Sequence, residues 1–198
     1  MEEEPIYISA ILMASGYSKR MGQNKLLLPF GDTTLLGRTL DVLHASQMID
    51  EMILIAREES VRTAGRERVD HVVENNRAAQ GISQSVRLGA ERARGTFYLF
   101  MPCDQPLLEP RHIRQIGRLA AEGKIVVPCI NQKIRGPCLF SRVFKKELCE
   151  LQGEEGGKKI IQRHMDDVIC TEILPPYALE DVDTWEEYEK ISKKINSA

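Results

Sequence analysis

Residues 9–31 decide how this sequence can be interpreted, and they read SAILMASGYSKRMGQNKLLLPFG. The apolar run Ile6–Met13 has the length and composition of a buried β-strand. It stops abruptly at three small residues, Ala14, Ser15 and Gly16. A loop of small residues at the carboxyl end of a strand exposes backbone N–H groups, and such groups suit a polyphosphate.

The same loop carries two cations of different character. Arg20 offers a planar fork for phosphate oxygens, and Lys25 offers a mobile point charge. The loop is not a P-loop, because Gly16 and Gly22 are six positions apart and Gln23 follows the second glycine. On spacing alone, an ordinary surface turn with solvated cations explains these residues equally well.

Composition limits the classes of protein to consider. The 198 residues suffice for one domain, and 42% apolar and 28% charged residues are ordinary for a globular chain. A net charge of −2 gives no field that would hold nucleic acid non-specifically. The acidic start of the chain is unlike a signal peptide, and no apolar run approaches ~20 residues. We therefore expect a cytoplasmic protein without a nucleic-acid or membrane partner.

Cysteine usage agrees with that compartment. The cysteines are odd in number, scattered and without a C-x-x-C pair: Cys103, Cys129, Cys138, Cys149 and Cys170. Such a pattern predicts reduced thiols rather than a disulfide framework.

Short apolar runs alternate with amphipathic stretches along the chain. This alternation predicts an α/β fold in which a mostly parallel sheet has helices on both faces. The expected strands are Ile6–Met13, Met52–Ala56, Val69–Val73, Phe97–Met101 and Ile125–Pro128, followed by a turn at Asn131–Gln132 and a return strand, Lys133–Phe140. The expected helices are Leu35–Ala45, Glu58–Ala64, Ile82–Ala93 and Arg111–Ala121.

Two further stretches fall at the same edge of the expected sheet. Residues 75–85 join a strand to a helix, where Gly81 permits close approach of a flat base and Ser85 presents a hydroxyl group. Asp104 follows the strand Phe97–Met101, a suitable place for a Mg²⁺ ligand. Taken singly, these stretches are explained as well by helix capping and by a turn aspartate.

Together the stretches resemble one family. Residues 13–29 match the nucleotidyltransferase signature L-A-A-G-x-S-x-R-M-G-x-x-K-x-L-L-P, with Ser15 in place of an alanine. Residues 75–86, 103–106, 136–141, 153–161 and 180–187 resemble further motifs of the molybdenum cofactor cytidylyltransferases, which belong to the NTP-transferase superfamily. The resemblance implies a three-layer α/β/α Rossmann-like fold in a single domain, residues 1–198, with residues of roughly 124–175 binding the acceptor.

The resemblance also implies an activity and its residues. The activity is transfer of CMP from CTP to the phosphate of molybdopterin, with release of pyrophosphate. Arg20 and Lys25 would be catalytic, and Asp104 and Asp183 would hold Mg²⁺ or Mn²⁺. The implied nucleotide-binding residues are Ala14, Ser15, Gly16, Arg20, Lys25, Gly81, Ser85 and Asp104.

Three alternatives stay open at this point. The donor could be GTP, or the acceptor could be a sugar phosphate or an erythritol phosphate. The chain could also be a non-catalytic chaperone that delivers the cofactor to an apo-enzyme of the xanthine dehydrogenase type. The two carboxylates that are expected to bind a metal ion, Asp104 and Asp183, argue against a pure carrier, because a carrier needs no metal ion.

Overall fold

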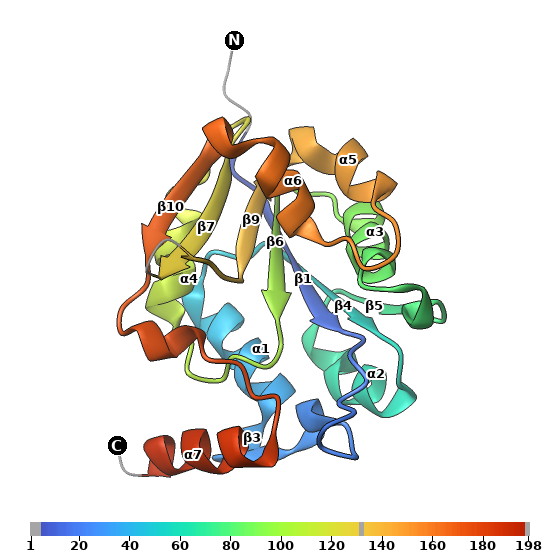
Figure 1. The fold of residues 1–198 in the computed structure, drawn as a ribbon, viewed down its shortest axis with the longest axis vertical. Coiled ribbons are helices and arrows are strands. Elements are labelled where there is room, and N and C mark those ends of the chain that lie inside the picture. Colours follow the sequence, from blue (N-terminus) through green and yellow to red (C-terminus); the bar gives the residue numbers. More distant parts are fainter. Residues whose placement is uncertain (1–4, 131–132, 197–198) are drawn as a thin grey trace.

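The computed structural model describes residues 5–130 and 133–196, and a mixed β-sheet lies at its centre (Figure 1). The strand order across the sheet is β10-β7-β9-β6-β1-β4-β5, and β8 pairs with β7 outside this path. Neighbouring pairs in β6-β1-β4-β5 and in β10-β7 are parallel, whereas β9 runs antiparallel to both β6 and β7. The fold is therefore α/β with a mostly parallel sheet, as predicted.

The elements have the following bounds. The strands are β1 (Ile8–Ala14), β2 (Pro29–Phe30), β3 (Thr33–Thr34), β4 (Glu51–Ala56), β5 (His71–Glu74), β6 (Phe97–Pro102), β7 (Ile125–Ile130), β8 (Lys133–Ile134), β9 (Cys138–Ser141) and β10 (Val168–Glu172). The helices are α1 (Leu35–Ser46), α2 (Glu59–Gly65), α3 (Ser83–Arg92), α4 (Pro110–Gly117), α5 (Lys145–Glu150), α6 (Gly157–Arg163) and α7 (Trp185–Asn196).

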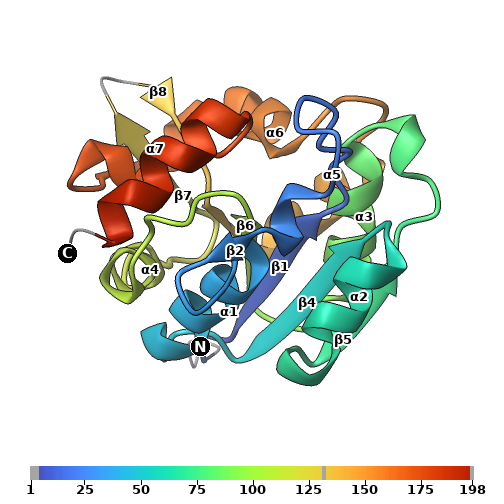
Figure 2. The same ribbon diagram turned by 90° about the horizontal axis from the view of Figure 1, so that it is seen from below.

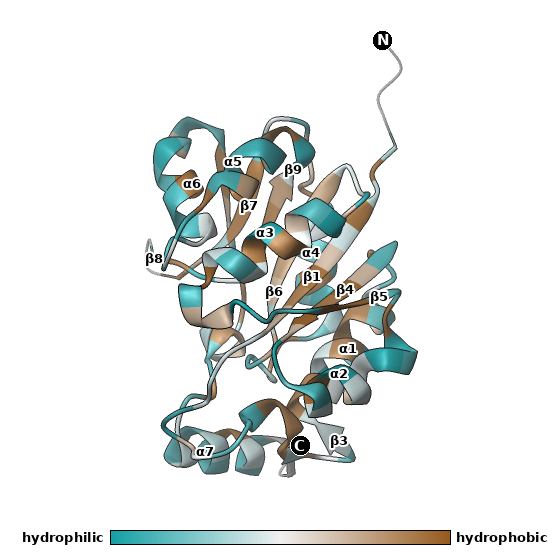
Figure 3. Ribbon diagram, turned by 90° about the vertical axis from the view of Figure 1, so that its right-hand side faces the viewer, coloured by the Kyte–Doolittle hydropathy of each residue, from teal (hydrophilic) through white to brown (hydrophobic). Residues whose placement is uncertain are grey.

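Successive side chains of the central strands enter two different cores. In β1, Leu12 packs with α1, α2 and α4, while its neighbour Ile11 packs with α3, α5 and α6 on the other face. This follows from the two-residue period of a strand. Figure 2 shows the two helical layers on either side of the sheet, and Figure 3 shows apolar residues gathered on the strands between them.

A third apolar cluster lies beyond the carboxyl ends of the central strands. It joins Phe30 of β2, Leu35 of α1 and Ile191 of α7 to the buried Val182. In Figure 1, α7 accordingly lies beside β3. This cluster brings the C-terminal segment to the edge of the sheet where the loop after β1 emerges.

Some expected elements need correction. The return strand predicted at Lys133–Phe140 is broken into β8 and β9, because Pro137 has no N–H group to donate to a ladder. The turn predicted at Asn131–Gln132 lies outside the described residues. Helix α4 ends at Gly117, earlier than predicted, and the sequence patterns had not identified β10.

The cysteine prediction was wrong for one pair. Cys129 of β7 and Cys170 of β10 form a disulfide, with their Cα atoms 5.7 Å apart. The sequence could not indicate this pair, because its members are 41 positions apart and meet only where two parallel strands become neighbours. Cys103, Cys138 and Cys149 are free thiols.

No helix in the described part of the chain combines the length and the apolar character needed to cross a membrane.

Candidate active site

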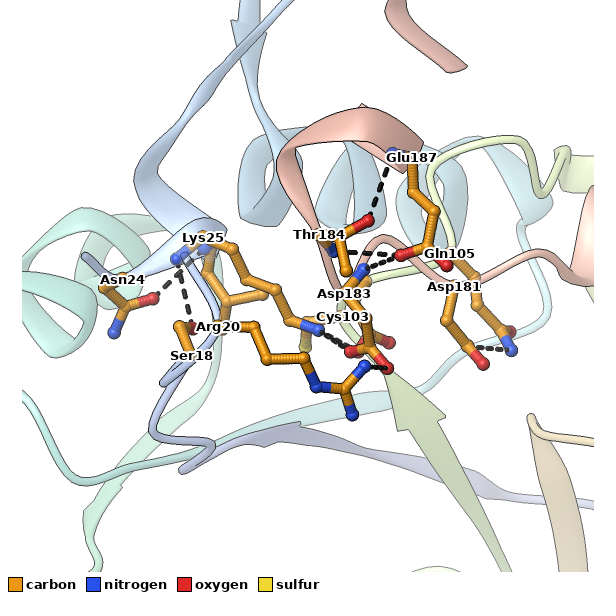
Figure 4. Close-up of polar contacts among 12 residues, drawn as sticks. Ser18, Arg20, Asn24, Lys25, Cys103, Gln105, Asp181, Asp183, Thr184 and Glu187 are labelled. Carbon is orange, nitrogen blue, oxygen red and sulfur yellow. Dashed lines mark hydrogen bonds and ion pairs between the residues drawn. The ribbon is translucent and has the colours of Figure 1, made fainter. Parts of the chain in front are cut away.

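The candidate site lies where β1 and β6 end. The loop after β1 carries Arg20 and Lys25, and Asp104 lies two residues after the end of β6. Asp183 approaches from the segment before α7, 158 positions after Lys25 in the chain. Figure 4 shows Asp183 between Lys25 and Arg20 on one side and Asp181 and Gln105 on the other.

The two carboxylates converge on the same nitrogen atom. Lys25 Nζ donates to Asp104 Oδ2 and to Asp183 Oδ1, both at 2.7 Å. Arg20 Nη1 adds a longer contact of 3.3 Å to the other oxygen of Asp183. The Lys25 side chain is 12% exposed and the Arg20 side chain 68%, so one cation is enclosed while the other reaches into solvent.

The charges of this cluster stabilise one another. Burial alone would lower the pKa of Lys25, but the charges and hydrogen bonds of Asp104 and Asp183 outweigh burial, and that pKa is raised. The hydrogen bond from Lys25 lowers the pKa of Asp183, with a further contribution from Arg20. Burial raises the pKa of the neighbouring Cys103 thiol, which is therefore inert and packs as an apolar group.

Local hydrogen bonds hold Lys25 in place. Its backbone N–H donates to Ser18 Oγ at 3.2 Å, and Asn24 caps the short 3₁₀ turn Lys25–Leu27 by accepting from the backbone N–H of Leu26. Asn24 Nδ2 donates in turn to Glu58 Oε2 at 2.9 Å, and the other oxygen of Glu58 accepts a hydrogen bond from Arg57. These hydrogen bonds connect the loop after β1 to Arg57 and Glu58, the residues that precede α2.

The start of α7 holds Asp183. Glu187 Oε2 accepts from the backbone N–H groups of Asp183 and Thr184, and Thr184 Oγ1 accepts from the backbone N–H of Glu187. This reciprocal arrangement is a capping box. It fixes the backbone of Asp183 and leaves the carboxylate free to reach Lys25.

A second group of expected residues forms a small cavity of about 280 Å³, here called the serine-lined cavity. Its lining includes Met13, Ser15, Gly16, Tyr17, Gly81 and Ser85. The buried Asn75 donates from Nδ2 to the hydroxyl groups of Ser15 and Ser85, at 3.2 and 2.9 Å. The two hydroxyl groups are therefore oriented by one amide.

Two glycines at this cavity have different reasons to lack a side chain. Gly81 has a φ of +104°, and a Cβ atom there would lie 2.1 Å from the carbonyl oxygen of Gly153. Its role includes close packing of two loops as well as proximity to the cavity. A Cβ atom on Gly16 would meet nothing within 4 Å, so the missing side chain leaves open space at the loop.

Three cavities follow one another along the edge of the sheet. The central cavity, of about 450 Å³, includes Gly16, Arg20, Lys25, Cys103, Asp104 and Asp183 in its lining. It shares Met13, Gly16 and Tyr17 with the serine-lined cavity. On its other side it shares Asp183 with the C-terminal cavity, of about 470 Å³, whose lining includes Ile130, Arg135, Tyr177, Asp181 and Lys190.

The structure brings most of the expected site residues together. Arg20, Lys25, Asp104 and Asp183 line the central cavity, and Ser15, Gly81 and Ser85 line the serine-lined one, while Gly16 lines both. Ala14 is different, because its side chain is buried in the core below the loop. Its part in nucleotide binding stays a prediction, as do the roles of the other residues.

Tyr17 is a residue at this site that the sequence analysis passed over. Its ring is 43% exposed and lines two cavities, and the guanidinium carbon of Arg57 lies 4.3 Å from the ring centroid. An aromatic residue in the middle of a glycine-containing loop was a visible signal. Arg57 and Glu58 gave no such signal, because they belong to a different βα connection.

The carboxylate pair fits a divalent cation. Asp104 and Asp183 each place an oxygen within hydrogen-bonding distance of one point, and Mg²⁺ prefers one or two carboxylates plus phosphate oxygens and water. The described residues contain no group of three or more His, Cys, Asp and Glu side chains that could hold a metal ion by themselves. The pair would therefore bind a cation together with a phosphate-bearing ligand.

A mostly parallel sheet ending in a cationic glycine loop and two convergent carboxylates is an arrangement suited to nucleotidyl transfer. The chain belongs to the family of the MobA-like NTP transferase domain, whose pattern matches residues 10–168. It is thus a nucleotidyltransferase of that family.

The curated relatives include a purine catabolism protein and two proteins named as molybdenum cofactor nucleotidyltransferases. The purine catabolism protein PucB of Bacillus subtilis is 26% identical over 96% of this chain and 98% of its own. The molybdenum cofactor cytidylyltransferase of Escherichia coli is 25% identical over 73% of this chain and 79% of its own. A probable molybdenum cofactor guanylyltransferase of Bacillus cytotoxicus is also 25% identical, over 75% of each chain.

Solved structures agree on the fold. Rv0371c of Mycobacterium tuberculosis is 31% identical, with a TM-score of 0.78 over 96% of this chain and 99% of its own. Its complex with manganese superposes with a TM-score of 0.74 over 94% of this chain and 98% of that one, at 30% identity. The nucleotidyl transferase Mth528 from Methanothermobacter has a TM-score of 0.85 at 21% identity, over 97% of this chain and 99% of its own.

Proposed function

We propose that this chain transfers CMP from CTP to the terminal phosphate of molybdopterin and releases pyrophosphate. The observation that carries the proposal is the convergence of Asp104 and Asp183 on Lys25, beside Arg20 and next to a loop with open space at Gly16. Positive groups and carboxylates at one point suit the handling of a metal-bound triphosphate.

The reaction asks for positioning and fixed charge more than for proton transfer. An oxygen of the acceptor phosphate forms a bond to the α-phosphorus of CTP, and the bond from that phosphorus to the pyrophosphate oxygen breaks. Arg20 and Lys25 hold the triphosphate and stabilise the charge that accumulates on the leaving pyrophosphate. Lys25 is suited to this role because its ammonium group has three N–H donors, of which two serve the carboxylates.

Asp104 and Asp183 are the groups that would hold Mg²⁺ or Mn²⁺. When bound, the cation would offset the negative charge of the phosphate oxygens. A cation held by Asp104 and Asp183 would use the carboxylate oxygens that Lys25 Nζ contacts, and Lys25 would then be free to turn toward phosphate. The manganese complex of the mycobacterial relative supports a divalent cation for this chain as well.

Cytosine is the base we propose for the serine-lined cavity. Ser15 stands where the family signature has an alanine, and it lines a cavity of about 280 Å³ that has room for a flat base. The Escherichia coli relative named as a cytidylyltransferase supports the same choice. Ser85, oriented by Asn75, would supply a hydroxyl group to the base or to its ribose, whereas Ser15 donates its own to the carbonyl oxygen of Ile55.

The recipient of the product, in this proposal, is an apo-molybdoenzyme of the xanthine dehydrogenase type. This recipient is proposed from the family resemblance, and the printed name of the Bacillus subtilis relative says only that it is a purine catabolism protein. In this proposal the chain first makes the pterin dinucleotide as an enzyme, and the product is then passed to that molybdoenzyme.

One assay tests the proposal directly. The purified chain is incubated with molybdopterin, Mg²⁺ or Mn²⁺, and each of four labelled nucleoside triphosphates in turn. We expect pyrophosphate and a labelled pterin dinucleotide with CTP, and no product without a divalent cation. A dinucleotide formed preferentially with GTP would replace CTP by GTP in the proposal. Pyrophosphate without any pterin product would disprove the acceptor.

A further inference from the structure

Helix α7 holds the loop after β1 by two hydrogen bonds to backbone carbonyl groups. The indole Nε1 of Trp185 donates to the carbonyl oxygen of Met21 at 3.2 Å, and the hydroxyl group of Tyr188 donates to the carbonyl oxygen of Pro29. Lys25 lies midway between these two acceptors in the chain. Two side chains of one helix therefore hold both ends of the segment that carries the enclosed cation of the site.

The two donors form one unit, here called the aromatic pair. Trp185 and Tyr188 are three positions apart on α7, a spacing that places side chains next to each other on a helix. Their rings pack edge to face, with the centroids 5.7 Å apart. The position of each donor group therefore depends on the other ring as well as on the helix.

Apolar packing brings α7 and the loop together but does not set their orientation. Met21 and Leu28 belong to the third apolar cluster with Ile191 of α7, and Tyr188 packs against that cluster. Apolar burial is non-directional, whereas a hydrogen bond to a carbonyl oxygen depends on angle as well as on distance. The aromatic pair therefore supplies the directional contacts between α7 and residues 21–29.

We propose that Trp185 and Tyr188 are positioning residues, which hold residues 21–29 so that Lys25 and Arg20 meet the triphosphate in a fixed place. The inference rests on the proposed function in the role that it gives to these two cations. Neither aromatic residue is among the described residues that line the central cavity, so each acts through the loop rather than on a ligand.

The other contacts between α7 and the loop involve charges that the substrate also attracts. The Asp183 carboxylate contacts Lys25 Nζ at 2.7 Å and Arg20 Nη1 at 3.3 Å. These ion pairs weaken when the two cations turn toward a triphosphate. The hydrogen bonds of the aromatic pair end on backbone carbonyl oxygens, which carry no charge that phosphate attracts, and they hold the loop when the ion pairs are weakened.

Fixed placement matters for this kind of reaction. Charged groups accelerate transfer when they are already in position as charge develops on the phosphate oxygens. Lys25 and Arg20 belong to a connecting loop, and such segments are more mobile than the helices and strands they join. Tying this loop at two points to a helix of 12 residues reduces that mobility.

Tyr188→Phe and Trp185→Phe test the inference, since each removes one donor and keeps an aromatic ring. Tyr7→Phe is the matched control, because its hydroxyl group also donates to a backbone carbonyl oxygen, that of Asp50, outside the site. If Trp185→Phe does not fold, Tyr188→Phe decides the test, because it lacks only one oxygen atom.

The first measurement reports the position of Lys25 without any ligand. The full chain is acylated briefly with acetic anhydride, and mass spectrometry gives the reaction rate of each lysine. We expect Lys25, whose side chain is 12% exposed, to react roughly threefold to tenfold faster in both variants, the range expected for the loss of one hydrogen bond. The rate at Lys124 in the same samples should be unchanged.

The second measurement connects this position with ligand binding. Inorganic triphosphate, which has no base or ribose, is titrated into the full chain with Mg²⁺ and followed by calorimetry. We expect Tyr188→Phe and Trp185→Phe to bind it roughly threefold to tenfold more weakly than the wild type and Tyr7→Phe do. In the CTP assay, the KM for CTP should rise in these two variants, and the KM for molybdopterin should be unchanged.

The outcomes separate this inference from the proposed function. An unchanged rate at Lys25 overturns the inference, and so does an equal increase at Lys124, which would mean that the whole chain has loosened. Unchanged affinity for inorganic triphosphate overturns it as well. Absence of CMP transfer by the wild type overturns the proposed function, whereas faster acylation of Lys25 alone and weaker triphosphate binding in the variants would still support the positioning role.

Discussion

The two sides of Asp183, here called the nucleotide flank and the C-terminal flank, are built in opposite ways. The nucleotide flank is one continuous loop, in which Ser18 and Asn24 orient Lys25 through bonds that span only a few residues. The C-terminal flank is assembled from β7, residues 176–183 and α7, and its cavity exists only in the folded chain. A site built locally leaves a pattern in the sequence, whereas a site built from distant segments leaves none.

The largest expected effect tests the charge on the nucleotide flank. Lys25→Ala should reduce kcat by roughly 10²–10³, the usual cost of one fixed positive charge at a developing oxyanion. Asp104→Ala should cost a factor of the same order, because it removes a carboxylate that would hold the cation. Lys124→Ala is the control, because Lys124 pairs with Asp167 before the amino end of β7, away from the site. Full activity of either variant in the CTP assay would remove that residue from the mechanism.

The same variants have a second readout that does not depend on turnover. Lys25 holds the two carboxylate oxygens that a divalent cation would use. Without nucleotide, Lys25→Ala should therefore bind Mn²⁺ more tightly than the wild type, and Asp104→Ala should bind it more weakly. Titration followed by electron paramagnetic resonance measures both, and identical Mn²⁺ affinities in all three proteins would contradict a metal site at this pair.

The second effect concerns the long-range construction of the C-terminal flank. The Cys129–Cys170 disulfide closes a loop with a sequence separation of 41 and ties β10 to β7, whose last residue, Ile130, lines the cavity. Cys170→Ser should lower the free energy of unfolding by about 2–4 kcal/mol.

Urea titration under non-reducing conditions measures that loss, with Cys149→Ser as the control, because Cys149 is a free thiol. In the denatured, unreduced wild type, a thiol reagent should find three of the five cysteines. Five reactive thiols would mean that the disulfide is absent.

The sequence allowed prediction where the determinants were local. The β-strand, the small residues and the cations of the loop lie within 25 positions of the chain, and Asp104 lies two residues after the end of β6. Asp183 could be linked to the site only through family resemblance, because folding alone brings it to Lys25. The disulfide was misjudged, since it depends on which strands become neighbours.

A smaller effect tests whether the nucleotide flank depends on its support from α2. Glu58 accepts from Asn24 and bonds Arg57, which stacks on Tyr17. Glu58→Gln leaves one side-chain oxygen to accept from both Asn24 and Arg57. Asn24→Asp places a second carboxylate next to that of Glu58. Each variant should lower kcat roughly tenfold, because a hydrogen bond to a charged group contributes about 1.5 kcal/mol.

The double variant with both changes should recover most of the activity. Its new amide would donate to the new carboxylate and accept from Arg57, which restores both contacts. Glu59→Gln is the control, because Glu59 bonds Arg62 and Thr63 rather than the loop. The double variant could instead have a kcat as low as that of either single variant, or one lowered by both losses combined. Either result would show that these contacts do not position Lys25.

The smallest effect is a pH dependence of the C-terminal flank. His112 of α4 is buried; its Nδ1 accepts from the backbone N–H of Glu109 at 3.1 Å, so its Nε2–H donates to the carbonyl oxygen of Leu174 at 3.0 Å. This neutral form ties α4 to the segment that leads into the C-terminal cavity. Burial lowers the pKa of His112 below its ordinary value of 6.5, despite the opposing contact with Leu174.

The sign of the effect follows from proton linkage. Below pH 6.5 the unfolded chain binds a proton at this position before the folded chain does, so stability decreases as pH falls toward the lowered pKa. Unfolding by urea at pH 7.5, 6.5 and 5.5 should show that decrease in the wild type, and a smaller one in His112→Gln. A steeper decrease in the variant would mean that His112 is charged in the folded protein, and that the contact with Leu174 does not require the neutral ring.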